Sequence, residues 1–338
     1  MKRRLSVIPL AIALLFLFCV GSSSSYAAEQ VITLKFSTLF PATHKVALLK
    51  GEWGKEVEKR TNGRVKIEVF PGAVLTPPAQ TYDSVKKGIA DIGETFSSYT
   101  SGRFPLSEAV DLPLGVTSAL QGTRMANAFY KQFKPKEYDD VKVLFMHTAA
   151  PQILCTKKPV NKLEEVKGLK IRSTGTSSQI VQALGGAPVG MSMGEAYDAI
   201  SRGVVNGVVG PVEVMKGWKL SEVLNSCTVY GSSHVNNAMV IMNKNKWNSI
   251  PPDLQKIIDQ VSEEFAEKQG KLWDELDKEG EEALLKKGGK MITLPKDEQA
   301  RWKAQLKPIL DEYVKNMKAK GLPGDEALKF NIDFLSKN

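Results

Sequence analysis

Residues 163–220 read LEEVKGLKIRSTGTSSQIVQALGGAPVGMSMGEAYDAISRGVVNGVVGPVEVMKGWKL. Within them, residues 169–172 predict a short strand, and the polar residues 173–178 predict a turn that begins a helix. Arg172 therefore ends a strand, where α/β sheets usually present ligand-binding groups. Its guanidinium group is always charged, and its planar fork of donors matches a carboxylate. We expect Arg172 to bind an anion; the alternative is a surface arginine in an ion pair.

Three motifs in this region occur together: GLKIRS at residues 168–173, GGAPV at 185–189 and GEAYDAISRGVVNGVVGPVE at 194–213. Their combination resembles the DctP-type substrate-binding proteins of TRAP transporters (tripartite ATP-independent periplasmic transporters). The resemblance extends from about residue 34 to the C-terminal helices. It implies an α/β, two-lobed periplasmic binding protein fold, with a hinge and a long helix that braces both lobes. It also implies that Arg172 binds the carboxylate of an organic acid.

Residues 1–27 have the form of a secretory signal peptide. Lys2, Arg3 and Arg4 precede an apolar run at residues 8–20, and Ala27 ends a plausible cleavage site. The run is too short for a membrane span, and no later stretch approaches the required length. We therefore expect an exported, periplasmic protein. Cleavage removes three basic residues and no acidic ones, so the net charge falls from +9 to +6.

That mildly basic surface suits the attraction of anions, but it lacks the basic tract of a nucleic-acid-binding protein. About 310 mature residues exceed the size of a single core, so two lobes are expected. The order of strands and helices in residues 31–94, with a third strand at 89–94, favours parallel pairing in the first lobe. A continuous amphipathic pattern predicts one long helix, and the resemblance implies that this helix spans both lobes. The expected division is lobe 1 at residues 28–150 and about 236–255, lobe 2 at 151–235 and about 285–338, and the long helix at about 252–285.

The chain is expected to cross between the lobes at residues 149–152 and 231–236, an arrangement that favours a hinge between relatively rigid halves. Cys155 and Cys227 are the cysteines that remain after signal cleavage. An exported pair can form a disulfide, but the sequence gives no geometry for it.

Patterns typical of catalysis are lacking in the sequence. His44, His147 and His234 are its histidines, and none has zinc-ligand spacing to another histidine or to a cysteine. The sequence has no P-loop, dinucleotide fingerprint or G-x-S-x-G motif. We therefore expect no catalytic residue, no metal and no cofactor. We also expect that the protein is not an enzyme.

The resemblance also bears on the ligand. Gln152 occupies the place of a second basic residue in some sugar-acid binders, and Leu39 and Phe96 stand where such relatives have polar contacts. Met193 stands where an aromatic side chain often packs on the ligand, and Gly210 where an asparagine often reaches the carboxylate. These departures favour one carboxylate held by Arg172, with an apolar or aromatic remainder.

The expected function is that of a monomeric receptor that closes its cleft around a small monocarboxylate and delivers it to the membrane subunits of a TRAP permease. A receptor for a sensor or another transporter is one alternative, and a secreted enzyme acting on small acids is another. Phe96 and Tyr99 have the alternative role of ordinary core aromatics. The expected ligand-binding residues are Arg172, Gln152, Phe96, Tyr99, Met193, Leu39, Phe40, Gly210, Pro211, Asn236 and Asn237.

Overall fold

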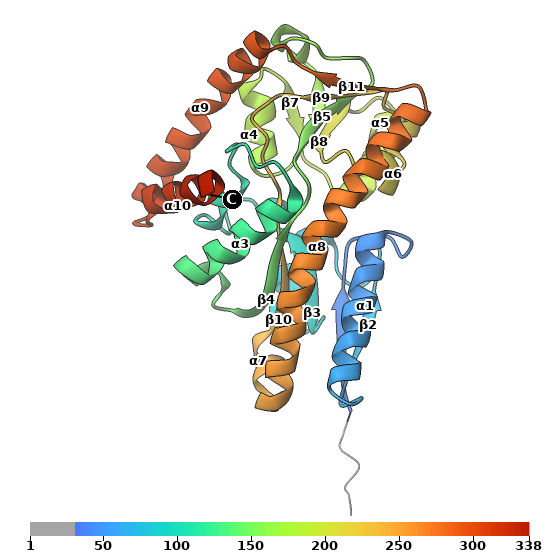
Figure 1. The fold of residues 1–338 in the computed structure, drawn as a ribbon, viewed down its shortest axis with the longest axis vertical. Helices are drawn as coiled ribbons and strands as arrows, with labels where there is room; N and C mark the ends of the chain where they lie inside the picture. The colour runs from blue at the N-terminus through green and yellow to red at the C-terminus, as the bar shows by residue number, and fades with distance from the viewer. Residues whose placement is uncertain (1–30, 338) are drawn as a thin grey trace, which may run out of the picture.

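The computed structural model describes residues 31–337, which form two lobes, each built on one β-sheet (Figure 1). The first sheet has the strand order β2-β1-β3-β10-β4. β1 pairs in parallel with β2 and β3, whereas β10 is antiparallel to β3 and β4. Its strands are β1 (Ile32–Ser37), β2 (Val65–Phe70), β3 (Ile92–Phe96), β4 (Val141–Thr148) and β10 (Asn237–Asn243).

The second sheet has the order β11-β9-β5-β8-β6-β7 and forms the second lobe. β6 lies between β8 and β7 and is parallel to both, whereas β5 is antiparallel to β8 and β9. Its strands are β5 (Ile153–Thr156), β6 (Lys170–Arg172), β7 (Ala187–Val189), β8 (Gly207–Gly210), β9 (Ser226–Val229) and β11 (Lys290–Thr293).

Helices cover both sheets. In α1, Leu49, Trp53 and Val57 recur at helical spacing and are buried against the first sheet, which explains why this segment is helical. The helices of the first lobe are α1 (Lys45–Arg60), α2 (Thr81–Lys86), α3 (Ala119–Phe133) and α7 (Lys244–Asn248). Those of the second lobe are α4 (Thr176–Ala183), α5 (Met193–Ser201) and α6 (Val214–Gly217). Among the described residues, no helix is long and apolar enough to cross a membrane.

One helix, α8 (Pro252–Lys286), runs along both lobes and is the longest element in Figure 1. At 1.5 Å per residue, its 35 residues span about 50 Å. Leu254, Ile258, Val261 and Phe265 are buried at intervals of three and four residues, as the sequence pattern predicted. α8 contacts α1, α3 and β4 of the first lobe and α6 and β11 of the second.

The chain crosses between the sheets at residues 149–152 and 230–236, and these two crossing segments lie side by side. The amide of Ala149 donates to the carbonyl of Asn236 at 3.1 Å, and that of Gln152 donates to the carbonyl of His234 at 2.8 Å. The crossings therefore form a short double connection, as expected for a hinge.

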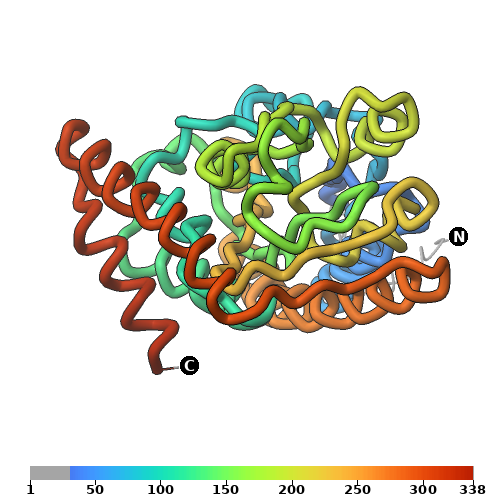
Figure 2. Tube along the Cα trace, turned by 90° about the horizontal axis from the view of Figure 1, so that it is seen from above, coloured from blue at the N-terminus to red at the C-terminus, as the bar shows by residue number. Residues whose placement is uncertain are grey.

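The C-terminal helices α9 (Lys296–Ala319) and α10 (Gly324–Lys337) lie together at one side of the molecule (Figure 2). We expected everything after about residue 285 to join the second lobe. β11 does pair with β9 there, but α10 packs on α3 of the first lobe. The reason is an aromatic contact: the ring of Phe330 lies 6.2 Å from that of Phe129 and 5.6 Å from that of Phe133.

The third strand begins later than expected, at Ile92 rather than residue 89. Gly88 has a φ of +77°, and the amide of Ile89 donates to the carbonyl of Ser84, so residues 88–91 complete the turn after α2. The strand continues to Phe96 because β10 supplies its partner there, with Ala238 opposite Phe96.

Cys155 and Cys227 form a disulfide between the neighbouring strands β5 and β9, where they lie opposite each other. The bond joins residues 72 apart in the sequence, and in the chain-entropy view closure of such a loop stabilises the fold by about 4 kcal/mol.

Candidate functional site

A cavity lies between the two lobes. Leu39 follows β1, Arg172 ends β6 and Trp273 comes from α8, so both sheets and the long helix contribute to its wall. The cavity volume is about 40 Å³, well below the roughly 300–1,000 Å³ of typical small-molecule sites, so the lobes lie close together here and the cavity must widen to admit a ligand. The lining residues are Leu39, Phe40, Phe96, Ser98, Tyr99, Ala149, Gln152, Arg172, Met193, Pro211, Glu213, Val214, Trp218, Asn236 and Trp273.

Arg172 is the cation of this cavity and is only 3% exposed. Its Nε donates to the carbonyl oxygen of Met191 at 3.0 Å, and its Nη2 donates to the hydroxyl of Tyr99 at 3.4 Å. Within residues 31–337, no carboxylate forms an ion pair with it. A hydrogen bond from Ser192 and, in smaller part, the charge of Arg172 lower the pKa of the nearby Glu195, so one carboxylate is close to Arg172 without bonding to it. A buried guanidinium group without an ion-pair partner is costly, so this position favours an anion that enters the cavity.

Tyr99 joins the lobes at this point. Besides receiving the bond from Arg172, its hydroxyl oxygen accepts a hydrogen bond from the amide of Met193 at 3.3 Å. Next to it, the Thr174 hydroxyl donates to that of Ser98 at 3.2 Å. The first lobe therefore touches the second on both sides of the guanidinium group.

Aromatic rings form much of the remaining wall. The ring of Phe40 lies 6.3 Å from that of Phe96, 6.1 Å from that of Trp218 and 5.8 Å from that of Trp273. Within the described residues, the buried indole N–H of Trp273 has no hydrogen-bond partner. A ligand here would be surrounded by flat, apolar surfaces with few polar groups.

A histidine and a carboxylate form one further contact between the lobes. His44 Nε2 lies 2.7 Å from Glu213 Oε1, and both side chains are 1% exposed. His44 precedes α1 in the first lobe, and Glu213 precedes α6 in the second. The amide of Glu213 also donates to Asp277 on α8 at 2.9 Å. Burial, together with the charge of Glu213, raises the pKa of Asp277 to about 7.

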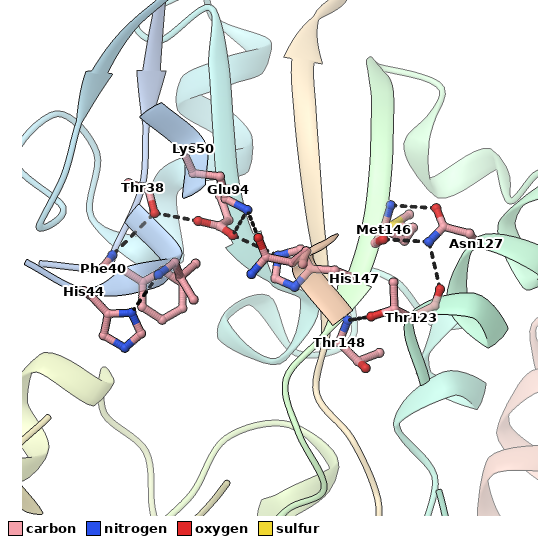
Figure 3. Close-up of polar contacts among 12 residues, drawn as sticks. Thr38, Phe40, His44, Lys50, Glu94, Thr123, Asn127, Met146, His147 and Thr148 are labelled. Atoms are coloured by element: carbon pink, nitrogen blue, oxygen red, sulfur yellow. Dashed lines mark hydrogen bonds and ion pairs between the residues drawn. The ribbon is translucent and has the colours of Figure 1, made fainter. Parts of the chain in front are cut away.

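A second buried polar network lies in the first lobe behind the aromatic wall (Figure 3). Lys50 Nζ lies 2.8 Å from Glu94 Oε1, and the same oxygen is 2.9 Å from His147 Nε2. Thr38 donates to the other oxygen of Glu94 at 2.6 Å. Burial by itself raises the pKa of Glu94, but Lys50 and His147 outweigh it and hold the pKa at about 2. None of these four residues lines the cavity, so we interpret the network as structural.

Nine of the eleven expected site residues line the cavity, but Gly210 and Asn237 do not. Gly210 lies in β8, and a Cβ there would meet Val214 at 3.4 Å and Met193 at 3.6 Å, so it stands behind the wall. Asn237 begins β10, where its amide donates to Asp111 at 2.6 Å. Gln152 is on the wall, but its side-chain amide donates to the carbonyl of Ala150 at 2.9 Å rather than standing free.

Several wall residues were not anticipated, above all Glu213, Trp218 and Trp273. Glu213 lies in the loop between β8 and α6 and Trp218 follows α6, whereas the expected site residues of this segment end at Pro211. Trp273 fits the apolar period of α8, so its sequence pattern does not distinguish a core position from a ligand contact. Among the described residues, no group of three or more His, Cys, Asp or Glu side chains could hold a metal ion.

Two lobes joined by paired crossings, with a buried cation in the cavity between them, are the features of a two-lobed solute-binding protein. Residues 36–316 match the family described as bacterial extracellular solute-binding protein, family 7. The chain belongs to this family, the DctP type of TRAP transporter substrate-binding proteins.

Solved structures of TRAP solute-binding proteins are similar over nearly the whole chain. One from Desulfovibrio salexigens is 34% identical, with a TM-score of 0.79, over 90% of this chain and 95% of that one. One from Rhodoferax ferrireducens, in complex with copurified benzoate, is 29% identical, with a TM-score of 0.86, over 91% and 98%. A marine metagenome protein specific for aromatic acid ligands, in complex with 3-hydroxybenzoate, is 30% identical, with a TM-score of 0.87, over 91% and 99%.

Proposed function

We propose that this protein is a periplasmic receptor that binds a small aromatic or branched monocarboxylate and delivers it to a TRAP-type membrane permease. The observation that carries the proposal is Arg172, a buried guanidinium group without a carboxylate partner in the described chain, set in an aromatic wall. The benzoate and 3-hydroxybenzoate complexes of similar proteins support the ligand class.

Binding is expected to combine one charged anchor with apolar burial. Each hydrogen bond from Arg172 to the carboxylate contributes about 1.5–3 kcal/mol, and burial of the rest of the ligand contributes about 25 cal/mol per Å². A sugar acid would place several hydroxyl groups against Phe40, Phe96 and Trp273, at a cost of about 1–3 kcal/mol for each one left unpaired. No step of this mechanism breaks a covalent bond, so the protein acts as a carrier and not as an enzyme.

Lobe closure completes the proposed mechanism. The acid enters an open cleft, and closure brings Tyr99 against Arg172 and excludes water. The closed surface then differs from that of the empty protein, which gives the permease a means to distinguish them. The receptor is expected to act as a monomer.

The first prediction tests the anchor. Arg172→Ala should weaken the binding of benzoate at least 100-fold, because two charge-assisted hydrogen bonds are lost. Arg172→Lys should restore little, since an ammonium group lacks the planar fork. Isothermal calorimetry with benzoate, a branched-chain 2-oxo acid and galacturonate measures both the anchor and the ligand class.

Arg202→Ala is the matched control, because Arg202 is an exposed arginine of the same lobe and does not line the cavity. Near-native affinity in Arg172→Ala would contradict the assignment of the anchor. Tighter binding of galacturonate than of the other two acids would contradict the ligand class.

A further inference from the structure

One carboxylate oxygen in the cavity wall, Oε2 of Glu213, accepts no hydrogen bond from the described residues. Glu213 is 1% exposed and lines the same cavity as Arg172. Its Oε1 is bonded to His44, whereas its Oε2 is buried and has no hydrogen-bond partner among residues 31–337. Burial of a carboxylate oxygen costs free energy when the hydrogen bonds that it made with water are not replaced. Glu213 is therefore placed to receive a hydrogen bond from a bound molecule.

The tautomer of His44 determines whether Glu213 already accepts a hydrogen bond from the protein. His44 Nδ1 lies 3.2 Å from the amide nitrogen of Val46 and accepts a hydrogen bond from it, so the ring N–H of the neutral imidazole is at Nε2. This N–H donates a hydrogen bond to Glu213 Oε1. The carboxylate thus already has one donor from the protein, and Oε2 remains an acceptor for a second.

Gly217 leaves room for the side chains of His44 and Glu213. A Cβ atom at Gly217 would lie 1.7 Å from Glu213 Oε1 and 2.6 Å from His44 Nε2, so no other residue fits there without displacing the pair. The ring of His44 is packed against those of Phe40 at 4.7 Å and Trp218 at 6.0 Å. Glu213 is consequently held in one position by its surroundings.

We propose that Glu213 determines ligand specificity: the site takes a monocarboxylate that also carries a hydroxyl group, and it rejects a dicarboxylate. This inference rests on the function proposed above. Arg172 binds the carboxylate, and Glu213 Oε2 accepts the hydroxyl proton. A second carboxylate of the ligand would instead meet the negative charge of Glu213 in a site that excludes water, where like charges repel strongly.

Matched probes test both halves of the proposal. Benzoate has no second polar group, 3-hydroxybenzoate and 4-hydroxybenzoate add a hydroxyl, and isophthalate and terephthalate add a carboxylate at the same two ring positions. Calorimetry on the wild-type protein should show at least one hydroxybenzoate binding about tenfold more tightly than benzoate, the value of one hydrogen bond to a charged group. Both dicarboxylates should bind at least tenfold more weakly than benzoate.

Glu213→Gln should change the two preferences in opposite directions. Its amide keeps an oxygen for His44 but replaces Oε2 by a neutral donor, to which a ligand hydroxyl can bond only as an acceptor. The hydroxyl advantage should therefore shrink, because the charge-assisted bond is lost, and at least one dicarboxylate should gain about tenfold. Glu282→Gln, the same change at an exposed position of α8, is the control and should leave every affinity unchanged. Melting temperatures without ligand verify that the variants are folded.

The outcomes separate this inference from the proposed function. If benzoate binds the wild-type protein but neither hydroxybenzoate binds more tightly, the role of Glu213 is wrong while the carboxylate receptor stands. A hydroxyl advantage that persists undiminished in Glu213→Gln would also overturn that role. If neither the five aromatic acids nor the branched-chain 2-oxo acid binds the wild-type protein, the proposed function is overturned and the inference with it.

Discussion

Among single residues, His234, in the second crossing segment, makes the free energy of unfolding depend on pH. It is fully buried, with Nε2 at 2.8 Å from the Ser177 hydroxyl and Nδ1 at 3.1 Å from the Tyr230 hydroxyl. Burial lowers the pKa of His234 to about 3, whereas an unfolded histidine has a pKa of about 6.5. Between these values the unfolded chain binds more protons than the folded one. The free energy of unfolding therefore rises with pH across this window, and stability is lost as the pH falls.

The corresponding prediction is that His234 alone costs the wild-type protein about 2 kcal/mol of stability between pH 7 and pH 5. His234→Gln should remove this part of the pH dependence. Urea unfolding of both proteins at the two pH values measures the difference. Other titrating groups are common to both proteins and cancel, including Asp111, whose pKa burial raises to about 8. An identical pH dependence in both proteins would contradict the prediction.

At the level of elements, α8 approaches both lobes through glycines. A Cβ at Gly270 would lie 2.9 Å from the Cα of Leu120 in α3, and a Cβ at Gly280 would lie 2.2 Å from the carbonyl oxygen of Val212. Both positions are helical and buried, where glycine is otherwise unfavourable. The close approach of α8 to the loop after β8 therefore depends on Gly280, and that loop carries Pro211 and Glu213 of the cavity wall.

Gly280→Ala should accordingly destabilise the protein by about 1–3 kcal/mol through overpacking and should also weaken ligand binding, because the loop must move. Gly51→Ala in α1 is the matched comparison, since a Cβ there meets nothing within 4 Å. It should stabilise the protein by about 0.5–1 kcal/mol through helix propensity. Urea unfolding and calorimetry measure the two effects, and equal stability of the two variants would show that the contact at Gly280 is not tight.

On the scale of the whole molecule, two crossing segments, α8 and the C-terminal helices connect the lobes. Contacts across the cavity, such as those of Tyr99 with Arg172 and of His44 with Glu213, join the facing surfaces. These contacts involve few side chains. Opening of the cavity would therefore expose little of the hydrophobic core of either lobe. We expect residues 149–152 and 230–236 to change their backbone angles while each lobe moves nearly as a rigid body.

Small-angle scattering tests this expectation. The free protein should have a larger radius of gyration than the protein saturated with ligand, because a bound carboxylate between Arg172 and the first lobe favours closure. The radius should then not change on addition of acid to Arg172→Ala. An unchanged scattering profile in wild-type protein, with binding confirmed by calorimetry on the same sample, would indicate a cleft that is closed before the ligand arrives.

The sequence by itself determined the long helix and the place of Arg172 at the end of a strand. The apolar periods of α1 and α8 require one buried face whatever the partner, and α8, expected at about residues 252–285, runs from Pro252 to Lys286. Arg172 could be placed at the end of a strand because a short apolar run precedes it and a helix start follows. The strands β7 and β11 could not be predicted, since three or four residues carry no readable alternation and pair only because β6 and β9 offer free edges.

Only the tertiary structure decided the rest of the site. His44 and Glu213 lie 169 residues apart and meet because the two lobes face each other, which no local pattern encodes. The disulfide was left open for the same reason, because the register of β5 against β9 places Cys155 opposite Cys227. Trp273 belongs to a helix face that is buried along its whole length, and the gap between the lobes makes this one position a cavity wall. Local periodicity thus fixes which face is buried, whereas contacts between distant segments fix what that face is buried against.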